Sequence, residues 1–552
     1  MEARSTTELR QLWLKIRSDI EASIRAWNPS PRLLAQLRSC RLHDARVAFF
    51  GLLTPDSLLQ PIARARVMLL VFASVLDRNL GLLGGMRALI GIMGAEELGV
   101  ARRAFPALQD KVRLLGLTAD EAALVLGIAA ENLEFDWPDG FGFWRRNLSP
   151  SNNLGEFFTP HEVMRFILTN AYTKIEHNDS TLTAIDPFGG IGSFLLLTHR
   201  FLESDGRFRR ARKRYVVIER NPIFSSIAAD LLHPLSSATT EVQVFCGDSM
   251  LLDANLLNPI PRSNPPSVTD LLGAADLVVT NPPYTRMKFH RSEFQAEESQ
   301  LSEATDKEID EYVLLMKQEI AAYKSKLKAF NELSPAMQGE WDLYRLGLMR
   351  CLSLMKPTGV LGIITPCSVL ADYRCSRLRE HILRSYSIEN VTIVGEHIKL
   401  FRTVNQPTAI YILHKEENPV TSICGHVQSW KKISEIADTH TITNEEILDR
   451  IGEPYPIPIC DSNLLGFYRK LIRLKRIADY LSGGVKRGEL DLTIHKKFKR
   501  NRERDKKTEE ERRALGWKTI IVWECEIRDQ QRLARRFWRV LGGSVPRFQS
   551  PS

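Results

Sequence analysis

The chain has 552 residues, with 75 Lys+Arg against 66 Asp+Glu and a formal net charge of +9. A hydrophobic fraction of 44% and a charged fraction of 26% exclude a wholly disordered or fibrous chain, and the length predicts two to four domains. Residues 486–552 hold 19 Lys+Arg and 10 Asp+Glu, and subtracting these from the totals leaves 56 of each for the rest. The positive excess therefore belongs entirely to the last 67 residues.

The beginning of the chain predicts a cytoplasmic protein without membrane contact. Met1 to Arg4 are not followed by an apolar run of signal-peptide character, and the most apolar stretch, around residues 67–74, is too short to span a bilayer. The eight cysteines lack paired short spacings, which disfavours a zinc ribbon or a disulfide framework, and we expect no metal.

Residues 1–145 predict a helical N-terminal domain. Apolar side chains recur there at spacings of three and four, for example at Leu9, Leu12, Ile16, Ile20 and Ile24. The Pro-Asp pairs of this segment lack the neighbouring acidic residues and lysine that a nuclease needs, so a nuclease role is disfavoured.

Residues 146–420 change to short β-branched runs that alternate with helical stretches. This pattern predicts an α/β fold, a doubly wound and mostly parallel sheet whose ligands bind beyond the carboxyl ends of the strands. The expected strands are 184–185, 215–218, 242–245, 276–280, 360–365, 391–394 and 409–413.

Two further segments lie outside this alternation. Residues 286–339 form a charged, helix-prone insertion, for which a solvated excursion and a contact with substrate remain open. Residues 415–485 are expected to be irregular, and residues 421–488 are assigned as a linker with the start of a recognition-like region. A small basic α/β tail, residues 489–552, completes the predicted organisation.

The first three expected strands each end in a carboxylate. Asp186 opens the sequence Asp-Pro-Phe-Gly-Gly-Ile-Gly-Ser-Phe, whose glycines permit positive φ and close backbone approach. Its glycine spacing is not the dinucleotide fingerprint, and no P-loop is present. Glu219 and Asp248 follow the next two strands, and an acid in such a place can accept both hydrogen bonds of a ribose diol. The three acids predict a site for a cationic, adenosine-containing ligand.

The fourth strand is followed by Asn281, Pro282, Pro283 and Tyr284. The prolines end the ladder and stiffen the backbone, which leaves the Pro282 carbonyl without local competition. The amide oxygen of Asn281 and this carbonyl could accept the two protons of an exocyclic amine. Tyr284 offers a ring for stacking on a planar base, worth about 1–3 kcal/mol.

Upstream of these motifs lies Gly-Glu-Phe-Phe-Thr-Pro at residues 155–160. Thr159 is a candidate helix cap, with Pro160 in the first helical turn. Capping alone suffices to explain that pair.

Taken in this order, the motifs resemble the gamma class of S-adenosylmethionine-dependent DNA amino-methyltransferases. Within that class the chain is most similar to adenine-N6 enzymes of type I modification subunits and of fused type II systems, over roughly residues 150–415. The resemblance implies S-adenosylmethionine as cofactor, double-stranded DNA as partner, a further specificity or restriction subunit, and a place in a prokaryotic restriction-modification or phage-defence system.

The same resemblance implies roles for single residues. By this resemblance, the methionine end of the cofactor binds to Thr159, Asp186, Gly189 and Gly192. Its ribose binds to Glu219, and its adenine amine binds to Asp248. Residues 281–284 take a target adenine flipped out of the duplex. The cofactor-binding set also includes the other members of the same motifs, Phe158, Pro160, Pro187 and Gly190.

Other functions remain open from the sequence. Enzymes that methylate a glutamine amide in release factors share the tetrapeptide but are much shorter, and cytosine-N4 enzymes usually carry Ser in place of Asn281. A DNA-binding or assembly protein with a cofactor site but no independent methylation is a second hypothesis. A repair-type endonuclease is a third.

The C-terminal region carries two partial resemblances. Residues 474–488 resemble the opening of a target-recognition domain that does not continue, and residues 495–541 resemble the last part of a very-short-patch repair endonuclease. The metal-binding aspartate and catalytic histidines of that family are not found before His495, so cleavage is not expected. A basic DNA-contacting module and a scar of gene rearrangement remain alternatives.

Overall fold

The computed structural model divides the chain into two compact units, Met1–Leu474 and Lys475–Ser552. The described residues are 6–24, 26–35, 59–80, 90, 94–114, 116–131, 159–175, 181–252, 258–259, 268–284, 287, 306–395, 407–427, 440–451 and 454–458. The predicted recognition-like start and basic tail lie outside them.

Four long helices represent the N-terminal region: α1 (Thr6–Ile24), α3 (Leu59–Leu80), α5 (Ala95–Leu114) and α6 (Ala119–Glu131). The three- and four-residue spacing is confirmed, because Leu9, Ile16 and Ile20 of α1 are buried in one hydrophobic core with Phe72 of α3. Helix α6 begins at a capping box, in which the Thr118 amide donates to Glu121 and the Glu121 amide donates to the Thr118 hydroxyl.

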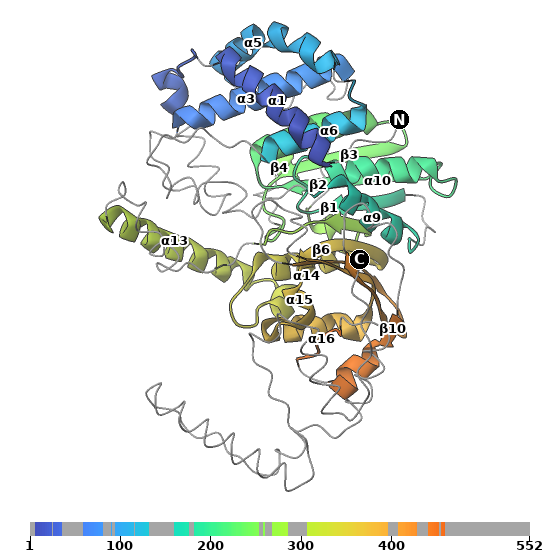
Figure 1. The fold of residues 1–552 in the computed structure, drawn as a ribbon. Coiled ribbons are helices and arrows are strands. Elements are labelled where there is room, and N and C mark those ends of the chain that lie inside the picture. The colour runs from blue at the N-terminus through green and yellow to red at the C-terminus, as the bar shows by residue number, and fades with distance from the viewer. Residues whose placement is uncertain are drawn as a thin grey trace, which may run out of the picture. The chain divides into compact units, whose positions relative to one another are not determined.

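The centre of the molecule is a ten-stranded sheet with the order β10-β9-β7-β8-β6-β5-β1-β2-β3-β4 (Figure 1). All seven expected strands are present. Their bounds, with those of three further strands, are β1 (Thr181–Asp186), β2 (Arg212–Glu219), β3 (Thr240–Cys246), β4 (Asn258–Pro259), β5 (Ala275–Thr280), β6 (Met355–Pro366), β7 (Tyr386–Val394), β8 (Thr408–Lys415), β9 (Val420–Val427) and β10 (His440–Thr443).

The strands β3, β2, β1, β5 and β6 run parallel to one another. All six residues of β5 are buried, as expected for a strand that helices cover on both sides. Strand β8 differs from the expected parallel arrangement: it lies between β6 and β7 and runs antiparallel to both. Apolar runs locate a strand but do not give its direction.

Residues 420–427 and 440–443 are more regular than we expected. Strand β9 pairs in parallel with β7, and β10 pairs antiparallel with β9, so the sheet continues past residue 420. Because β9 has few strongly apolar residues and Pro419 directly precedes it, it lacks the alternation that marks a half-buried strand.

Helices pack on the sheet in two series. The first is α9 (His161–Tyr172), α10 (Ser193–Ser204) and α11 (Pro222–Leu232), of which α10 contacts both neighbours. The second is α14 (Leu343–Leu354), which packs on β5 and β6, and α16 (Ser376–Ser385), which packs on β7. Since right-handed crossovers lead away from β1 in opposite directions, the two series cover opposite faces of the sheet.

The N-terminal helices share their core with the first helical series. Phe224, Ile227 and Leu231 of α11, together with Ile191, belong to the same buried cluster as the side chains of α1, α3, α5 and α6. Among the helices that the structure describes, none has the length and apolar character needed to cross a bilayer.

Candidate active site at the carboxyl ends of the central strands

The predicted site residues follow strands that are neighbours in the sheet. Strand β1 lies between β2 and β5, so the order of the strands reverses there. In open α/β sheets this reversal separates the crossover helices and leaves a ligand crevice beyond the carboxyl ends. Asp186 ends β1, Glu219 ends β2 and Asn281 directly follows β5.

Asp186 connects the ends of β1 and β5. Its side chain is 1% exposed, and its Oδ1 accepts a hydrogen bond from the Thr280 hydroxyl at 2.6 Å and one from the Phe188 amide at 3.2 Å. Burial is the main cause that raises the pKa of this carboxyl, the two hydrogen bonds oppose the rise and the charge of Glu219 adds to it, and the net pKa is about 7. Asp186 is therefore a buried acid that titrates near neutral pH.

Glu219 holds the glycine turn that follows β1. Its Oε2 accepts from the Gly190 amide at 2.8 Å and its Oε1 from the Asn221 amide at 2.7 Å. Burial raises the pKa of Glu219, and these backbone donors oppose the rise. The Arg220 amide is a third backbone donor, and since a carboxylate offers about four acceptor positions, Glu219 keeps room for another donor.

The glycines of this turn are required by its shape. Gly190 and Gly192 have φ values of 53° and 83°, a region that residues with a side chain rarely adopt. A Cβ added to Gly189 would lie 2.5 Å from Val217 Cγ1 of β2. Helix α10 begins directly after Gly192. The turn thus places the backbone and a helix N-terminus against the ends of β1 and β2.

Asp248 follows β3 and accepts hydrogen bonds from its own loop and from one distant segment. Its Oδ1 accepts from the Met250 amide at 2.9 Å, and its Oδ2 accepts from the Tyr323 hydroxyl at 2.6 Å. Tyr323 belongs to α13 (Asp306–Leu327), the helix of the charged insertion. Part of this insertion therefore contacts a predicted site residue, so the interpretation as a solvated excursion alone is wrong.

The tetrapeptide packs closely against α14. Pro282 and Tyr284 are buried, whereas Asn281 and Pro283 are partly exposed. A Cβ added to Gly347 of α14 would lie 2.8 Å from Pro282 Cβ, so this helix can approach the tetrapeptide only with glycine there. Tyr284 is 8% exposed, and burial raises the pKa of its hydroxyl well above the usual value.

Thr159 and Pro160 directly precede α9 and are both partly exposed. Pro160 occupies the N-cap position and no side chain caps the helix, so the expected Thr159 cap is not formed. Helix α9 lies close to the sheet because β6 carries Gly362, whose added Cβ would meet Ile167 Cγ2 at 2.5 Å. Phe158 lies outside the described residues.

The structure thus joins Asp186 to the β5 end, Glu219 to the glycine turn and Asp248 to the insertion. The sequence did not predict three residues that contact the candidate site: Thr280, Tyr323 and Gly347. Thr280 directly precedes Asn281 and could have been found from its place at a strand end. No sequence signal distinguishes Tyr323 or Gly347 from other helical residues.

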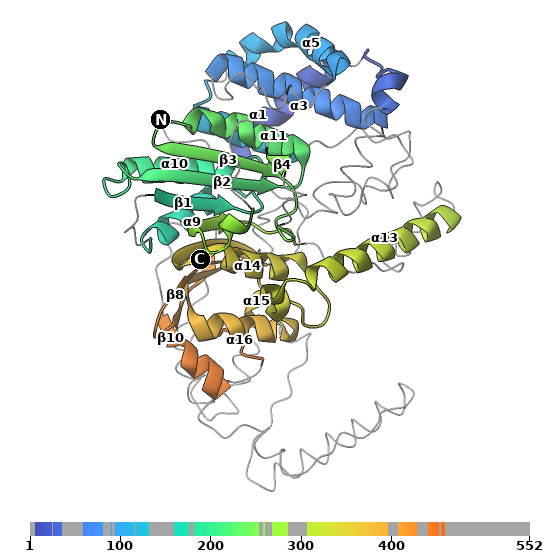
Figure 2. The same ribbon diagram turned by 180° about the vertical axis from the view of Figure 1, so that it is seen from behind.

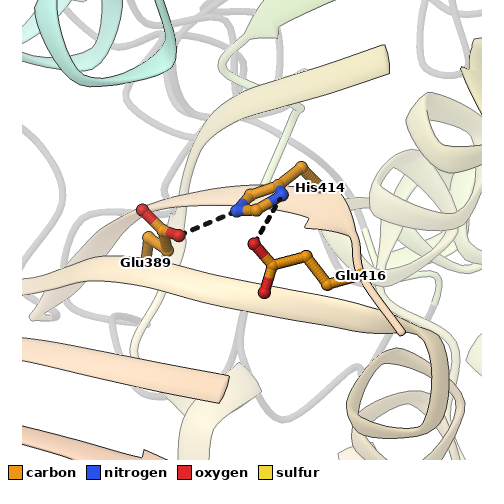
Figure 3. A group of neighbouring side chains, drawn as sticks. All are labelled: Glu389, His414 and Glu416. Carbon is orange, nitrogen blue, oxygen red and sulfur yellow. Dashed lines mark hydrogen bonds and ion pairs between the residues drawn. The ribbon is translucent and has the colours of Figure 1, made fainter. Parts of the chain in front are cut away.

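A second cluster of ionisable side chains contains Glu389, His414 and Glu416, whose possible ligand atoms lie within 4.8 Å of one another. Figure 3 shows His414 between the two carboxylates, with Nε2 2.8 Å from Glu389 Oε1 and Nδ1 3.6 Å from Glu416 Oε1. Lys174 also donates to Glu389 Oε1, at 2.7 Å, and supplies a positive charge.

Burial opposes ionisation of Glu389, but the hydrogen bonds from His414 and Lys174 outweigh it, so the pKa of Glu389 is lowered. Because His414 pairs in register with Ser387 near the start of β7, the cluster lies at the end of the sheet away from the carboxyl ends. We interpret it as an ion-pair network that connects β7 and β8 to the segment after α9.

Comparisons with known proteins come from a family model and from solved structures. The model described as N-6 DNA Methylase matches residues 146–455. No curated protein matches the chain. A type I restriction-modification methyltransferase subunit from Streptococcus thermophilus has 16% identity and a TM-score of 0.45, with 83% of this chain and 99% of that chain covered. The DrdV–DNA complex has 15% identity and a TM-score of 0.48, with 78% of this chain but only 43% of that chain covered.

Proposed function

Since this chain belongs to the N-6 DNA Methylase family and is therefore an adenine-specific DNA methyltransferase, we propose that S-adenosylmethionine binds at the carboxyl ends of β1, β2 and β3. The target adenine is then presented to residues 281–284. The observation that carries this proposal is the hydrogen bond between the Thr280 hydroxyl and the Asp186 carboxylate. Asp186 opens the glycine-containing motif after β1, and Thr280 directly precedes Asn281. The two motifs are 94 positions apart in the chain.

The residues at these strand ends fit S-adenosylmethionine chemically. The sulfonium and ammonium groups of the cofactor are cationic, and Asp186, Glu219 and Asp248 are three carboxyls at adjoining strand ends. Beyond its three backbone donors, Glu219 retains acceptor capacity for a ribose hydroxyl. The turn containing Gly189 and Gly192 provides close backbone approach, because an added Cβ at either position would collide with a neighbouring side chain.

When bound, the cofactor supplies an electrophilic methyl group. The chain's own contribution is to bind and orient: we assign the methionine end to Thr159, Asp186, Gly189 and Gly192, with Phe158, Pro160, Pro187 and Gly190 in the same surroundings. The Asn281 amide oxygen and the Pro282 carbonyl accept the hydrogens of adenine N6, and Tyr284 stacks on the flipped base. Positioning and electrostatics provide most of the acceleration.

The order of the motifs along the chain supports the gamma class. Thr159 and Pro160 precede β1, the Asp186 motif follows it, and residues 281–284 come after β5. We place the protein in a restriction-modification system of the prokaryotic cytoplasm, with double-stranded DNA as substrate and a specificity or restriction subunit as partner.

A methylation assay with the Asn281→Ala variant tests this function. The variant loses an acceptor for adenine N6, so we expect methyl transfer to DNA to fall by about 10²-fold or more. Asn331→Ala, at an exposed position, is the matched control and should methylate at the parental rate. Parental methylation by Asn281→Ala would contradict the assignment.

The substrate itself is identified by modification-sensitive sequencing of DNA from a host that expresses this chain alone. A single motif containing N6-methyladenine is the expected result. Cofactor binding without methylation of any DNA would instead favour the DNA-binding or assembly protein.

A further inference from the structure

The insertion helix α13 is fastened to the protein at one end. Ile320 and Leu327, in its C-terminal part, are buried at 7% and 0% exposure, whereas Leu314 is 57% exposed. Figures 1 and 2 agree that the helix leads away from α14 and the sheet toward its N-terminal end. The buried end carries Tyr323.

The hydroxyl of Tyr323 reaches the carboxylate that follows β3. It donates to Asp248 Oδ2 at 2.6 Å, while the Met250 amide donates to Oδ1 at 2.9 Å. Two donors on different oxygens fix the plane of the carboxylate. Because a carboxylate has about four acceptor positions, each oxygen can still accept one further hydrogen bond.

The proton of Tyr323 is firmly held, so the hydroxyl is a donor at neutral pH. Burial raises the pKa of Tyr323 well above its usual value, and the charge of Asp248 raises it further. The same loop is held from another side by Arg350 of α14, which donates to the Met250 carbonyl at 2.5 Å. Since Arg350 and the Met250 amide already hold the loop, the Tyr323 bond is not needed to close it.

We propose that Tyr323 is a positioning residue for the adenine of the cofactor: its hydroxyl orients Asp248 so that the carboxylate accepts the exocyclic amine. This inference rests on the proposed function, because it takes Asp248 as the acceptor of that amine. It adds a residue from the insertion, outside the strand-end motifs, to the cofactor site.

Calorimetric binding of S-adenosylhomocysteine tests the proposal without depending on catalysis. Tyr323→Phe keeps the ring and removes the donor, so we expect the affinity to fall by about three- to tenfold. Tyr373→Phe, whose parent side chain is 62% exposed, is the matched control and should bind as the parent does.

A second ligand separates positioning from a general structural role. S-inosylhomocysteine has a carbonyl in place of the exocyclic amine, so the group at this position of the ring becomes an acceptor and no longer donates to Asp248. The parent should bind it more weakly than S-adenosylhomocysteine, and Tyr323→Phe should reduce this discrimination by a similar factor of about three to ten. A ratio of two affinities measured on one preparation does not depend on how much of the protein is folded.

Asp248→Ala, which removes both acceptor oxygens, makes the two levels of failure distinguishable. If this variant keeps both the affinity and the discrimination of the parent, the adenine does not bind at Asp248 and the proposed cofactor site is wrong. If Asp248→Ala loses discrimination while Tyr323→Phe keeps it, the cofactor site stands and the role of Tyr323 is overturned. Tighter binding by Tyr323→Phe also overturns it, because the hydroxyl would then compete with the ligand. In the double variant, the Tyr323 substitution should add no further loss of discrimination.

Discussion

The substitution Asp186→Asn is expected to stabilise the protein at alkaline pH and not at acidic pH. Asparagine has the shape of aspartate, and its Oδ1 can still accept from the Thr280 hydroxyl and the Phe188 amide. The change therefore removes an ionisation while the two hydrogen bonds remain. Because the parent side chain is 1% exposed, solvent provides little compensation for its charge.

The direction in which stability changes with pH follows from the raised pKa of Asp186. The ordinary value is 3.8 and the folded value is about 7, so between these limits the folded state keeps a proton that the unfolded state has lost. The parent's stability thus falls as the pH rises through this window and changes no further above it. Each pKa unit corresponds to about 1.36 kcal/mol, so the loss between about pH 5.5 and 7 is about 2 kcal/mol and the loss over the whole window at most about 4 kcal/mol.

Urea unfolding followed by tryptophan fluorescence measures this effect at about pH 5.5, 7 and 8.5. The gain of Asp186→Asn over the parent should grow by about 2 kcal/mol from the first pH to the second and then level off. Asp270→Asn, at an exposed position, is the control for general effects of charge. A gain that is the same at all three pH values would refute the reasoning. The stabilised variant should also bind S-adenosylhomocysteine more weakly at alkaline pH, because a carboxylate charge is lost.

Three other changes have expected outcomes. Gly347→Ala places a Cβ 2.8 Å from Pro282 Cβ and should destabilise the protein by about 1–3 kcal/mol in urea unfolding and slow methyl transfer; unchanged values would show that α14 can move away. Tyr284→Phe should retain methyl transfer and Tyr284→Ala should lose it, and equal rates for the two variants would contradict base stacking. Deleting residues 486–552 should lower DNA affinity and its dependence on salt while leaving cofactor binding intact, and an unchanged salt slope in a filter-binding titration would make the basic excess incidental.

The strands of the central sheet could be predicted because buried strands consist of contiguous apolar residues. The carboxylates Asp186 and Glu219 were found by the same logic, since each ends such a run. Strand direction was not accessible in this way, so the antiparallel entry of β8 was missed. Strand β9 was missed because its neighbours, and not its own apolar pattern, make it part of the sheet.

The contacts that shape the site depend on residues that are far apart in the chain. Tyr323 and Asp248 are separated by 75 positions. The sequence around a tyrosine in a charged helix does not indicate which residue its hydroxyl will contact. Gly347 similarly owes its importance to the side chains that α14 meets, among them Pro282 and Phe188. Motif order predicted which strand ends lie together, whereas packing determined which side chains contact them.

The hydrogen bond between α13 and Asp248 has a thermodynamic consequence for whatever molecule contacts that helix. If such a molecule favours the Tyr323–Asp248 bond, and this bond strengthens cofactor binding, then the cofactor must increase the affinity for that molecule by the same factor. The free energy is shared between the two ligands and has no preferred direction. An insertion that reaches from the protein surface to a strand-end carboxylate is therefore a place where occupancy of one site can be sensed at another.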